Sequence, residues 1–358
     1  MIYWSMSGQK QGTDQDTTAC TQGEPATEFF AEKDAPPELV SALMRLSPAN
    51  PFCTKSHADA MREYGHEPWL LGIKRRGQLV AGCYGCRFSG RLNRGFRIIS
   101  LPKAACEDIF WDGLMRFCSL HKIACLEVNT FNSLGAHIPR LPGEVERLEG
   151  IEYVLDLEDP DWERKVAKKH RYSIRMALRA GVTLRRATDA DSCREHVRLM
   201  AATQERRRKR GESISGNLKQ ELLYSTCLLE KGGGELFQAV VGGETVSSYL
   251  LLRAVEGAFG ITAGTSPEGM TCGASHFLIY SVARTLREES MRVFNLGGVE
   301  SNPGLGLFKS RFGAAPVVFE STSFYLGNNF RRRVTDTARF VRRTGTRLLG
   351  RIGGVSDP

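Results

Sequence analysis

What the sequence lacks already limits what the protein can be. Nowhere in its 358 residues does an apolar run approach the roughly 20 residues of a membrane-spanning helix. The first 18 residues also lack the basic start, long apolar middle and small-residue cleavage site of a secretory signal. We therefore expect a cytoplasmic protein with no integral membrane segment.

Patterns for metal and dinucleotide binding are missing too. Ten cysteines are present, but the chain is long and shows no export signal, so we expect reduced thiols and no disulfide framework. Cys83 and Cys86 have zinc-like spacing, yet they lie in a predicted strand, where residues three apart face opposite sides, and there is no second Cys-x-x-Cys pair. No predicted strand is followed by a dinucleotide fingerprint. We expect no metal and no Rossmann oxidoreductase.

The composition is that of a globular protein, with 41% hydrophobic and 25% charged residues. A length of 358 residues fits two domains. Residues 1–27 are polar without an apolar period and predict a disordered leader. After it, one order of elements occurs twice, in residues 28–150 and 151–330, and residues 331–358 form a basic tail.

Both halves follow the order helix, strands, helix, strand. The first predicts a helix over 38–46, strands over 69–74, 79–88 and 96–101, a helix over 107–121 and a strand over 124–129. The second predicts helices over 190–210 and 218–231, strands over 235–241, 244–253 and 258–263, a helix over 273–289 and a strand over 292–296. Matching positions are 166 residues apart for Leu70 and Leu236 and 168 apart for Leu126 and Phe294. Such a near-constant offset indicates a duplicated α+β unit.

The net charge of +9 is concentrated in two segments. Residues 164–210 hold 16 Lys or Arg against four acids, and residues 331–351 hold eight Arg against one Asp. These sums of +12 and +7 leave −10 for the rest of the chain. An anionic partner is expected to meet these segments, although each also fits a solvated helix surface. The arginine-rich tail fits contact with a membrane surface as well.

Between the halves, the sequence predicts one helix that Asp159 caps and that Gly181 ends in a left-handed conformation. Its apolar stripe consists of Trp162, Val166, Ile174 and Leu178. Nine basic residues and no acid lie between Arg164 and Arg186. Like charges this dense repel one another, and a polyanion would relieve the repulsion. The cations expected to meet it are Lys165, Lys168, Lys169, Arg171 and Arg175.

The most distinctive segment runs from Phe294 to Gly313 and reads Phe-Asn-Leu-Gly-Gly-Val-Glu-Ser-Asn-Pro-Gly-Leu-Gly-Leu-Phe-Lys-Ser-Arg-Phe-Gly. A predicted strand ends at Leu296, the glycines follow, and Lys309 and Arg311 lie on a short amphipathic turn. Glycines let the backbone come close to a ligand, and a cation beyond the end of a strand can stabilise a developing oxyanion. Composition alone leaves an ordinary glycine loop with surface cations as the alternative.

The end of this segment, Phe308-Lys-Ser-Arg-Phe-Gly313, resembles the C-terminal signature of the Fem family, peptidyltransferases that add amino acids from aminoacyl-tRNA to peptidoglycan precursors. The segment from Lys169 to Val182 is similar to the family's basic motif at the entry to the second domain, and Thr203-Gln-Glu-Arg206 is also similar to a Fem pattern. The resemblance covers residues 150 to 325. It implies an α+β fold of tandem acetyltransferase-like (GNAT) domains, each a mixed, mostly antiparallel sheet flanked by helices.

The resemblance leaves two acyl donors open. The long Fem proteins carry a helical hairpin that this chain lacks, so it resembles the compact type or the related GNAT acyltransferases that use acyl-CoA. A CoA site needs a Gln/Arg-x-x-Gly-x-Gly/Ala loop at a helix N-terminus, where free N–H groups hold the pyrophosphate. The corresponding loop, Met270 to Ser275, matches only at Gly273, and Leu101 to Cys106 in the first half has no glycine. A tRNA donor needs positive surface, which residues 164–210 supply.

The resemblance assigns a role to Lys309, whereas position in the predicted elements and charge assign roles to other residues. Lys309 is the residue expected to stabilise the oxyanion when an amine attacks an activated carbonyl. The residues expected to bind substrate are Arg206, Tyr249, Gly297, Gly298, Phe308 and Arg311. Tyr249 also fits plain core packing. The helix cations Lys165, Lys168, Lys169, Arg171 and Arg175 are expected to bind tRNA.

The leading hypothesis is therefore an acyltransferase that moves an aminoacyl group from aminoacyl-tRNA to an amine of a peptide, a peptidoglycan precursor or a small metabolite. It needs no cofactor other than this co-substrate. No Ser-His-Asp or Cys-His spacing points to a covalent acyl-enzyme. One alternative keeps the fold and takes acyl-CoA as donor. The other is a non-catalytic RNA-binding protein.

Overall fold

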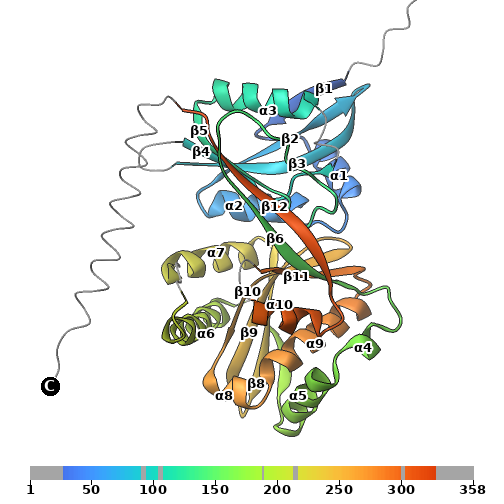
Figure 1. Ribbon diagram of the computed structural model, residues 1–358, viewed down its shortest axis with the longest axis vertical. Coiled ribbons are helices and arrows are strands. Elements are labelled where there is room, and N and C mark those ends of the chain that lie inside the picture. Colours follow the sequence, from blue (N-terminus) through green and yellow to red (C-terminus); the bar gives the residue numbers. More distant parts are fainter. Residues whose placement is uncertain are drawn as a thin grey trace, which may run out of the picture.

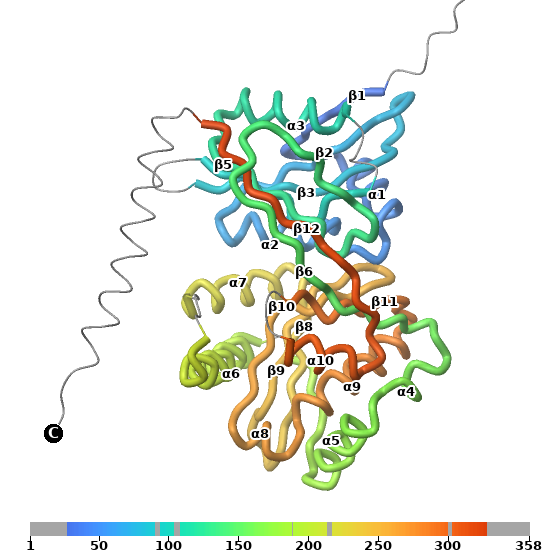
Figure 2. Tube along the Cα trace, in the orientation of Figure 1, coloured from blue at the N-terminus to red at the C-terminus, as the bar shows by residue number. Residues whose placement is uncertain are grey.

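The computed structural model describes residues 27–89, 94–103, 108–187, 189–212, 217–299 and 303–327. Residues 1–26 of the expected leader and the basic tail from residue 331 onward lie outside these ranges. Within them, twelve strands form one sheet that runs through both halves of the molecule, with helices on its two faces (Figures 1 and 2).

Each half contributes five strands and the helices that cover them. The elements of the first half are β1 (Thr27–Glu32), α1 (Pro37–Leu46), the 3-10 helix η1 (Pro51–Cys53), α2 (Lys55–Glu63), β2 (Glu67–Arg75), β3 (Gln78–Ser89), β4 (Arg94–Ile98), α3 (Asp108–Leu120) and β5 (Ile123–Asn129). Those of the second half are α4 (Trp162–Lys165), α5 (Lys168–Arg179), β7 (Thr183–Ala187), α6 (Ala190–Lys209), α7 (Leu218–Glu230), β8 (Gly234–Val241), β9 (Glu244–Arg253), β10 (Gly257–Thr265), α8 (Pro267–Thr271), α9 (Ala274–Glu288), β11 (Val293–Val299) and α10 (Pro303–Ser310). Two long strands, β6 (Glu144–Asp156) and β12 (Ala315–Tyr325), lie between the halves.

The two central strands are exchanged between the halves. β6 follows the first half in sequence but pairs with β11 of the second, whereas β12 ends the second half and pairs with β5 of the first. β6 and β12 also pair with each other along most of their length. The exchange makes one sheet out of two (Figure 1), and residue 150, where the sequence indicated a domain boundary, lies inside β6.

The strand order is symmetric about this central pair: β1-β2-β3-β4-β5-β12-β6-β11-β10-β9-β8-β7. Each half has one parallel contact, β4 with β5 and β10 with β11, and the remaining pairs of strands are antiparallel. The prediction of a duplicated α+β unit with mixed, mostly antiparallel sheets is therefore confirmed.

A shared core holds the halves together. On one face of the second half, Phe237, Leu251 and Phe294 pack with residues of α5 and α9. On the other face, Leu250 and Phe259 belong to a cluster that also contains Phe52 and Met61 from the first half. Because this cluster takes apolar side chains from both halves, separating them would expose it to water.

The single helix predicted from Asp159 to Gly181 is wrong, because the chain forms α4 and α5 with a break at Val166. Val166 has an extended ψ of 122°, and the N–H of the next residue, Ala167, donates to the carbonyl of Arg311 at 2.8 Å. The break fully buries Val166. The predicted apolar stripe fails at one position, since Leu178 is 57% exposed.

Candidate active site

The candidate site begins where two parallel strands separate. β10 and β11 are paired only over Gly257–Phe259 and Val293–Asn295. Beyond these residues both strands are irregular, β10 between Gly260 and Thr262 and β11 between Asn295 and Gly298. Bulges of this kind turn a strand away from its neighbour, so the two strands open at the glycines that the sequence singled out.

Gly297 allows the closest approach at this opening. Its φ of +82° is a left-handed value, and a Cβ atom at this position would lie 2.6 Å from the carbonyl oxygen of Gly260 on β10. Residues other than glycine are disfavoured on both grounds. The close approach that the structure shows at Gly297 is to the facing strand β10, whereas the expected approach to a ligand stays a prediction.

Lys309 extends from α10 to the backbone of these glycines. Its Nζ donates to the carbonyl oxygen of Gly297 at 2.8 Å and to that of Gly298 at 3.0 Å. The side chain is only 9% exposed. Burial lowers the pKa of Lys309 from 10.5 to about 8, and the nearby Glu152 carboxylate opposes this change. The ammonium group is thus fixed at the strand opening, away from bulk solvent.

A buried network of polar side chains is hydrogen-bonded to the backbone of Gly297. The N–H of Gly297 donates to Asn295 Oδ1 at 2.8 Å, and Asn295 Nδ2 donates to Glu152 Oε2 at 3.1 Å. The N–H of Asn132, from the first half, donates to the same carboxylate oxygen at 2.9 Å. Glu152 is 1% exposed, its Oε1 has no partner among the described residues, and burial raises its pKa.

Sequence reasoning missed this network. Asn295 lies in the segment from Phe294 to Gly313, but an asparagine at this position gives no reason by itself to assign it a role. Glu152 is one of several acids in the segment that becomes β6, and only the pairing of β6 with β11 brings it to Asn295. Neither local pattern nor spacing carries that information.

Tyr249 and Phe308 lie near the opening but face the interior. Tyr249 is 5% exposed, its hydroxyl donates to the carbonyl of Leu296 at 3.4 Å, and it covers Gly260 so closely that a Cβ there would collide with it. Phe308 packs against Phe312 and two histidine rings. The structure thus places both aromatic residues as supports of the opening.

Arg206 lies at the other end of β10. Its Nη2 donates to Thr203 Oγ1 at 3.0 Å, and Thr203 in turn accepts the N–H of Thr265, the last residue of β10. Its buried Nη1 has no partner in the described part of the chain, and burial lowers the pKa of the guanidinium. An unpaired, partly desolvated cation of this kind suits an anionic substrate group.

Comparison with known proteins finds similarity in the second half of the chain and in the fold as a whole. Residues 164–306 match the family model of the acetyltransferase (GNAT) domain. This match falls within the second half of the chain. No curated protein matches the chain in sequence.

Solved structures extend the similarity to both halves. The crystal structure of FemX has a TM-score of 0.59 at 12% identity, with 78% of this chain and 95% of that chain covered. A tandem GNAT protein from the clavulanic acid biosynthesis pathway has a TM-score of 0.52 at 13% identity, with 85% and 100% covered. L-PGS from Bacillus licheniformis has a TM-score of 0.50 at 12% identity, with 86% and 98% covered. The tandem GNAT-like fold that the Fem resemblance implied is confirmed.

The N-terminus of α9, within the region that matches the GNAT model, is covered by α5. Gly273, the residue before α9, has a φ of +80°, and a Cβ there would lie 2.6 Å from the carbonyl oxygen of Ser173 on α5. His170 of α5 meets His276 of α9 edge to face with 4.5 Å between ring centroids, and burial lowers the pKa of His276 to about 4. The one glycine that fits a CoA loop is therefore explained by the approach of α5.

The outer surface of α5 carries the basic residues that remain free. Lys168, Lys169 and Arg175 are exposed and form no ion pair within the described ranges, and Arg171 bonds only a backbone carbonyl. Lys165, in contrast, pairs with Asp159 at 2.5 Å. The cations of α6 are largely neutralised by acids one turn away, through the pairs Arg194–Asp191, Arg198–Glu195 and Arg208–Glu205. The charge of residues 164–210 is thus available mainly on α5.

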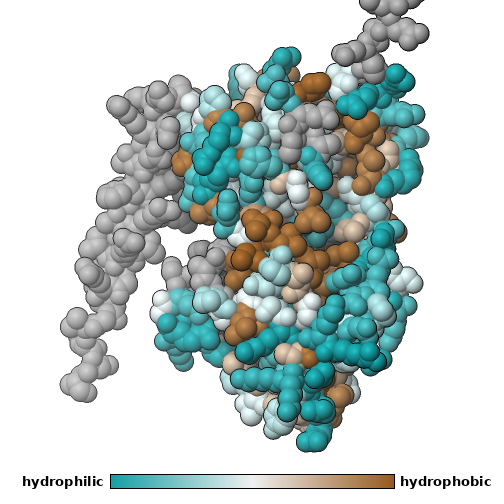
Figure 3. Space-filling view, turned by 45° about the vertical axis from the view of Figure 1, so that its right-hand side comes forward, coloured by the Kyte–Doolittle hydropathy of each residue, from teal (hydrophilic) through white to brown (hydrophobic). Residues whose placement is uncertain are grey.

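The surface around α10 is apolar. Figure 3 shows an apolar area between the two halves, where β6, β12 and α10 meet. Leu307 on α10 is 52% exposed, Ile151 on β6 is 40% exposed, and Val318, its register partner on β12, is 65% exposed. Arg311 follows α10, is half-buried and forms no ion pair within the described ranges. Lys309 therefore lies on the buried side of α10, and the outer side of the same helix is apolar.

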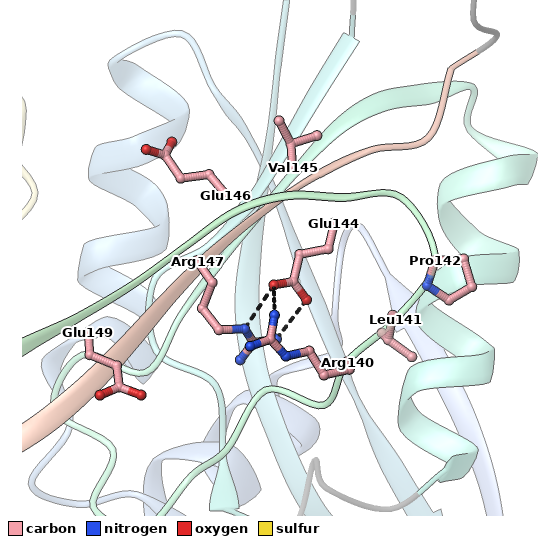
Figure 4. Close-up of a pocket in the computed structure, with 8 residues that line it drawn as sticks. All are labelled: Arg140, Leu141, Pro142, Glu144, Val145, Glu146, Arg147 and Glu149. Atoms are coloured by element: carbon pink, nitrogen blue, oxygen red, sulfur yellow. Dashed lines mark hydrogen bonds and ion pairs between the residues drawn. The ribbon is translucent and has the colours of Figure 1, made fainter.

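Other features of the molecule fit a structural role. A hollow of about 910 Å³ lies beside β6, and three of the charged residues that line it pair with one another, since Glu144 accepts from both Arg140 and Arg147 (Figure 4). Among the residues in the structure, no group of three His, Cys, Asp or Glu side chains is placed to hold a metal ion. None of the helices described here is both long and apolar enough to cross a membrane.

Proposed function

We propose that this acyltransferase takes an aminoacyl group from aminoacyl-tRNA and transfers it to the amine of a peptide, a peptidoglycan precursor or a small metabolite. The observation that carries the proposal is the buried Lys309 ammonium at the opening of β10 and β11, in the same domain as the unpaired cations of α5. Charged tRNA is a cytoplasmic substrate, so we place the reaction in the cytoplasm.

The proposed chemistry is a direct attack. The neutral acceptor amine forms a C–N bond to the ester carbonyl, the carbonyl oxygen takes up negative charge, and the ester C–O bond to the tRNA ribose then breaks. The extra proton of the amine goes to the leaving ribose oxygen. The Lys309 ammonium stabilises the oxyanion, and a single donor of this kind contributes about 3 kcal/mol to the transition state.

The described contacts support tRNA over acyl-CoA as donor. In a CoA site, the N–H groups at the N-terminus of a helix hold the pyrophosphate. Here α5 packs against that end of α9, with Ser173 at Gly273 and His170 on His276. The same α5 presents free cations to solvent, which suits a polyphosphate backbone.

Three outcomes of one assay separate the proposal from its alternatives. The protein is incubated with acyl-CoA and with tRNA charged with a radiolabelled amino acid, and a peptidoglycan precursor peptide and short free peptides serve as acceptors. Ribonuclease-sensitive transfer of label supports the proposal. Release of free coenzyme A from acyl-CoA, without transfer from tRNA, supports the CoA alternative. Salt-sensitive retention of tRNA without transfer would identify a non-catalytic RNA-binding protein.

A further inference from the structure

A second cavity lies between the two halves, on the face of the sheet covered by α2 and α7. Its volume is about 280 Å³. Both halves supply polar and aromatic side chains to it, including Tyr64, His66, Arg97, Glu221, Tyr224 and Thr262. None of these residues takes part in the chemistry described above.

The cavity holds two opposite charges that are not paired with each other. Arg97 donates through Nε to Glu127 at 2.6 Å, and its two terminal nitrogens have no hydrogen bond in the described ranges. The Glu221 carboxylate has neither an ion pair nor a hydrogen bond there, and burial raises its pKa. Arg97 and Glu221 both line the cavity beside Tyr64 and Tyr224. Burial raises the pKa of both tyrosines most, Glu221 raises it further and Arg97 lowers it. The cation and the anion thus face one small space.

Aromatic rings form part of the wall between these charges. Tyr64 and Tyr224 meet edge to face with 5.4 Å between ring centroids, and His66 lies 5.0 Å from Tyr64. Neither tyrosine hydroxyl has a hydrogen bond among the described residues. Aromatic faces attract ammonium groups, and unpaired hydroxyls bind polar ligand atoms.

The cavity is next to the strand opening. Thr262, which lines it, directly follows the irregular part of β10 that faces Gly297, and its hydroxyl bonds the buried His196 at 2.9 Å. A ligand in the cavity would therefore touch the strand that frames the Lys309 site.

We propose that this cavity binds a small zwitterion of the amino-acid class, with its carboxylate on Arg97 and its ammonium group on Glu221 against the tyrosine rings. The opposite charges, which form no ion pair with each other, and the small volume together fit a ligand that carries both charges on a short frame. The inference does not depend on which acyl donor the protein uses.

Binding to the full-length protein tests this by isothermal titration calorimetry with L-alanine, L-serine and L-leucine, each alongside its N-acetyl and methyl ester derivatives. At least one free amino acid should bind. Its N-acetyl form lacks the ammonium group and its ester lacks the carboxylate, so each should bind about tenfold more weakly or worse. No binding of any amino acid up to about 10 mM, or equal binding of the derivatives, would overturn the proposal.

Variants locate the binding in the cavity. Glu221→Gln should weaken binding of the free amino acid about tenfold while leaving binding of the N-acetyl form unchanged, and Arg97→Met should do the same with the ester form. Glu230→Gln, on the exposed side of the same helix α7, is the matched control and should bind as the wild type. Equal effects of Glu221→Gln and Glu230→Gln would rule out this site. Because the derivatives are compared on wild-type protein, the test holds even if a variant fails to fold.

Discussion

Lys309 Nζ lies 2.8 Å from the carbonyl oxygen of Gly297, so this almost fully buried cation at the strand opening is held by glycines that precede it in the motif. The residues between them are the end of β11, residues 300–302, which lie outside the described ranges, and most of α10. A buried lysine bonded only to neutral carbonyls is costly for the fold, which favours a role in binding charge over a role in stability.

Removing this cation should abolish transfer without unfolding the protein. We expect Lys309→Ala and Lys309→Met to lower the transfer rate about 100-fold or more, which is the usual cost of losing one oxyanion donor. Both variants should melt at or above the wild-type temperature, since each removes a desolvated charge. Transfer assays and thermal melts on the same samples check this, and wild-type transfer by a folded Lys309→Ala variant would contradict the assignment.

The activity should fall as the pH rises through about 8, because the pKa of Lys309 is lowered to about 8 and the ammonium form is the one that stabilises the oxyanion. Lys309→Arg keeps a permanent charge and should move this descending limb to higher pH. Glu152→Gln removes the carboxylate that raises the pKa of Lys309 and should move the limb to lower pH. A pH–rate profile that is identical in all three proteins would exclude Lys309 as the titrating group.

The same pKa predicts a pH effect on stability. The folded pKa of Lys309 is below its unfolded value of 10.5, so between about 8 and 10.5 the unfolded chain binds more protons. The contribution of this residue to the free energy of unfolding should therefore increase as the pH rises through that window. Urea denaturation of the wild type and of Lys309→Met from pH 7 to 10.5 measures it. A constant difference between the two across the window would contradict the prediction.

Charge reversal on α5 should weaken tRNA binding. We expect Lys168→Glu, Lys169→Glu and Arg175→Glu together to lower affinity about tenfold or more and to reduce the slope of log affinity against log salt by about one per lost phosphate contact. The control is the triple change of Arg194, Arg198 and Arg208 on α6 to Glu, which alters the net charge equally but affects cations already paired with acids. Equal losses from both sets, measured by filter binding across salt, would show that only total charge matters.

Substitution of Gly297 should lower the free energy of unfolding by more than its left-handed φ alone would explain. Gly232→Ala is a suitable reference, because Gly232 has a φ of +67° and open space around its Cβ position, and it should cost about 1 kcal/mol. Gly297→Ala adds the contact with Gly260 and should cost about 2 kcal/mol more, with loss of transfer. Urea denaturation of both variants measures the difference, and equal costs would mean that the strands relax freely.

Local patterns predicted much of the architecture. Alternating and helical periodicity located most strands and helices to within a few residues: the helix expected over 107–121 is α3, Asp108–Leu120, and that over 273–289 is α9, Ala274–Glu288. The offset of 168 residues between Leu126 and Phe294 also anticipated their equivalent places, each in a strand parallel to its neighbour and beside an exchanged central strand. The positions of helices and strands depend on residues close in sequence, and the repeat is visible as a constant spacing, so the sequence alone predicts both.

The sequence by itself therefore determined the elements, their repetition and the glycine-lysine motif. Only the tertiary structure decided the exchange of β6 and β12, the break at Val166, which cations remain unpaired, and the burial of Glu152 behind Gly297. Each of these depends on a partner more than 100 residues away in sequence or on competition among several nearby acids. Periodicity along the sequence does not predict these features, because they depend on which distant surfaces pack against each other and exclude water.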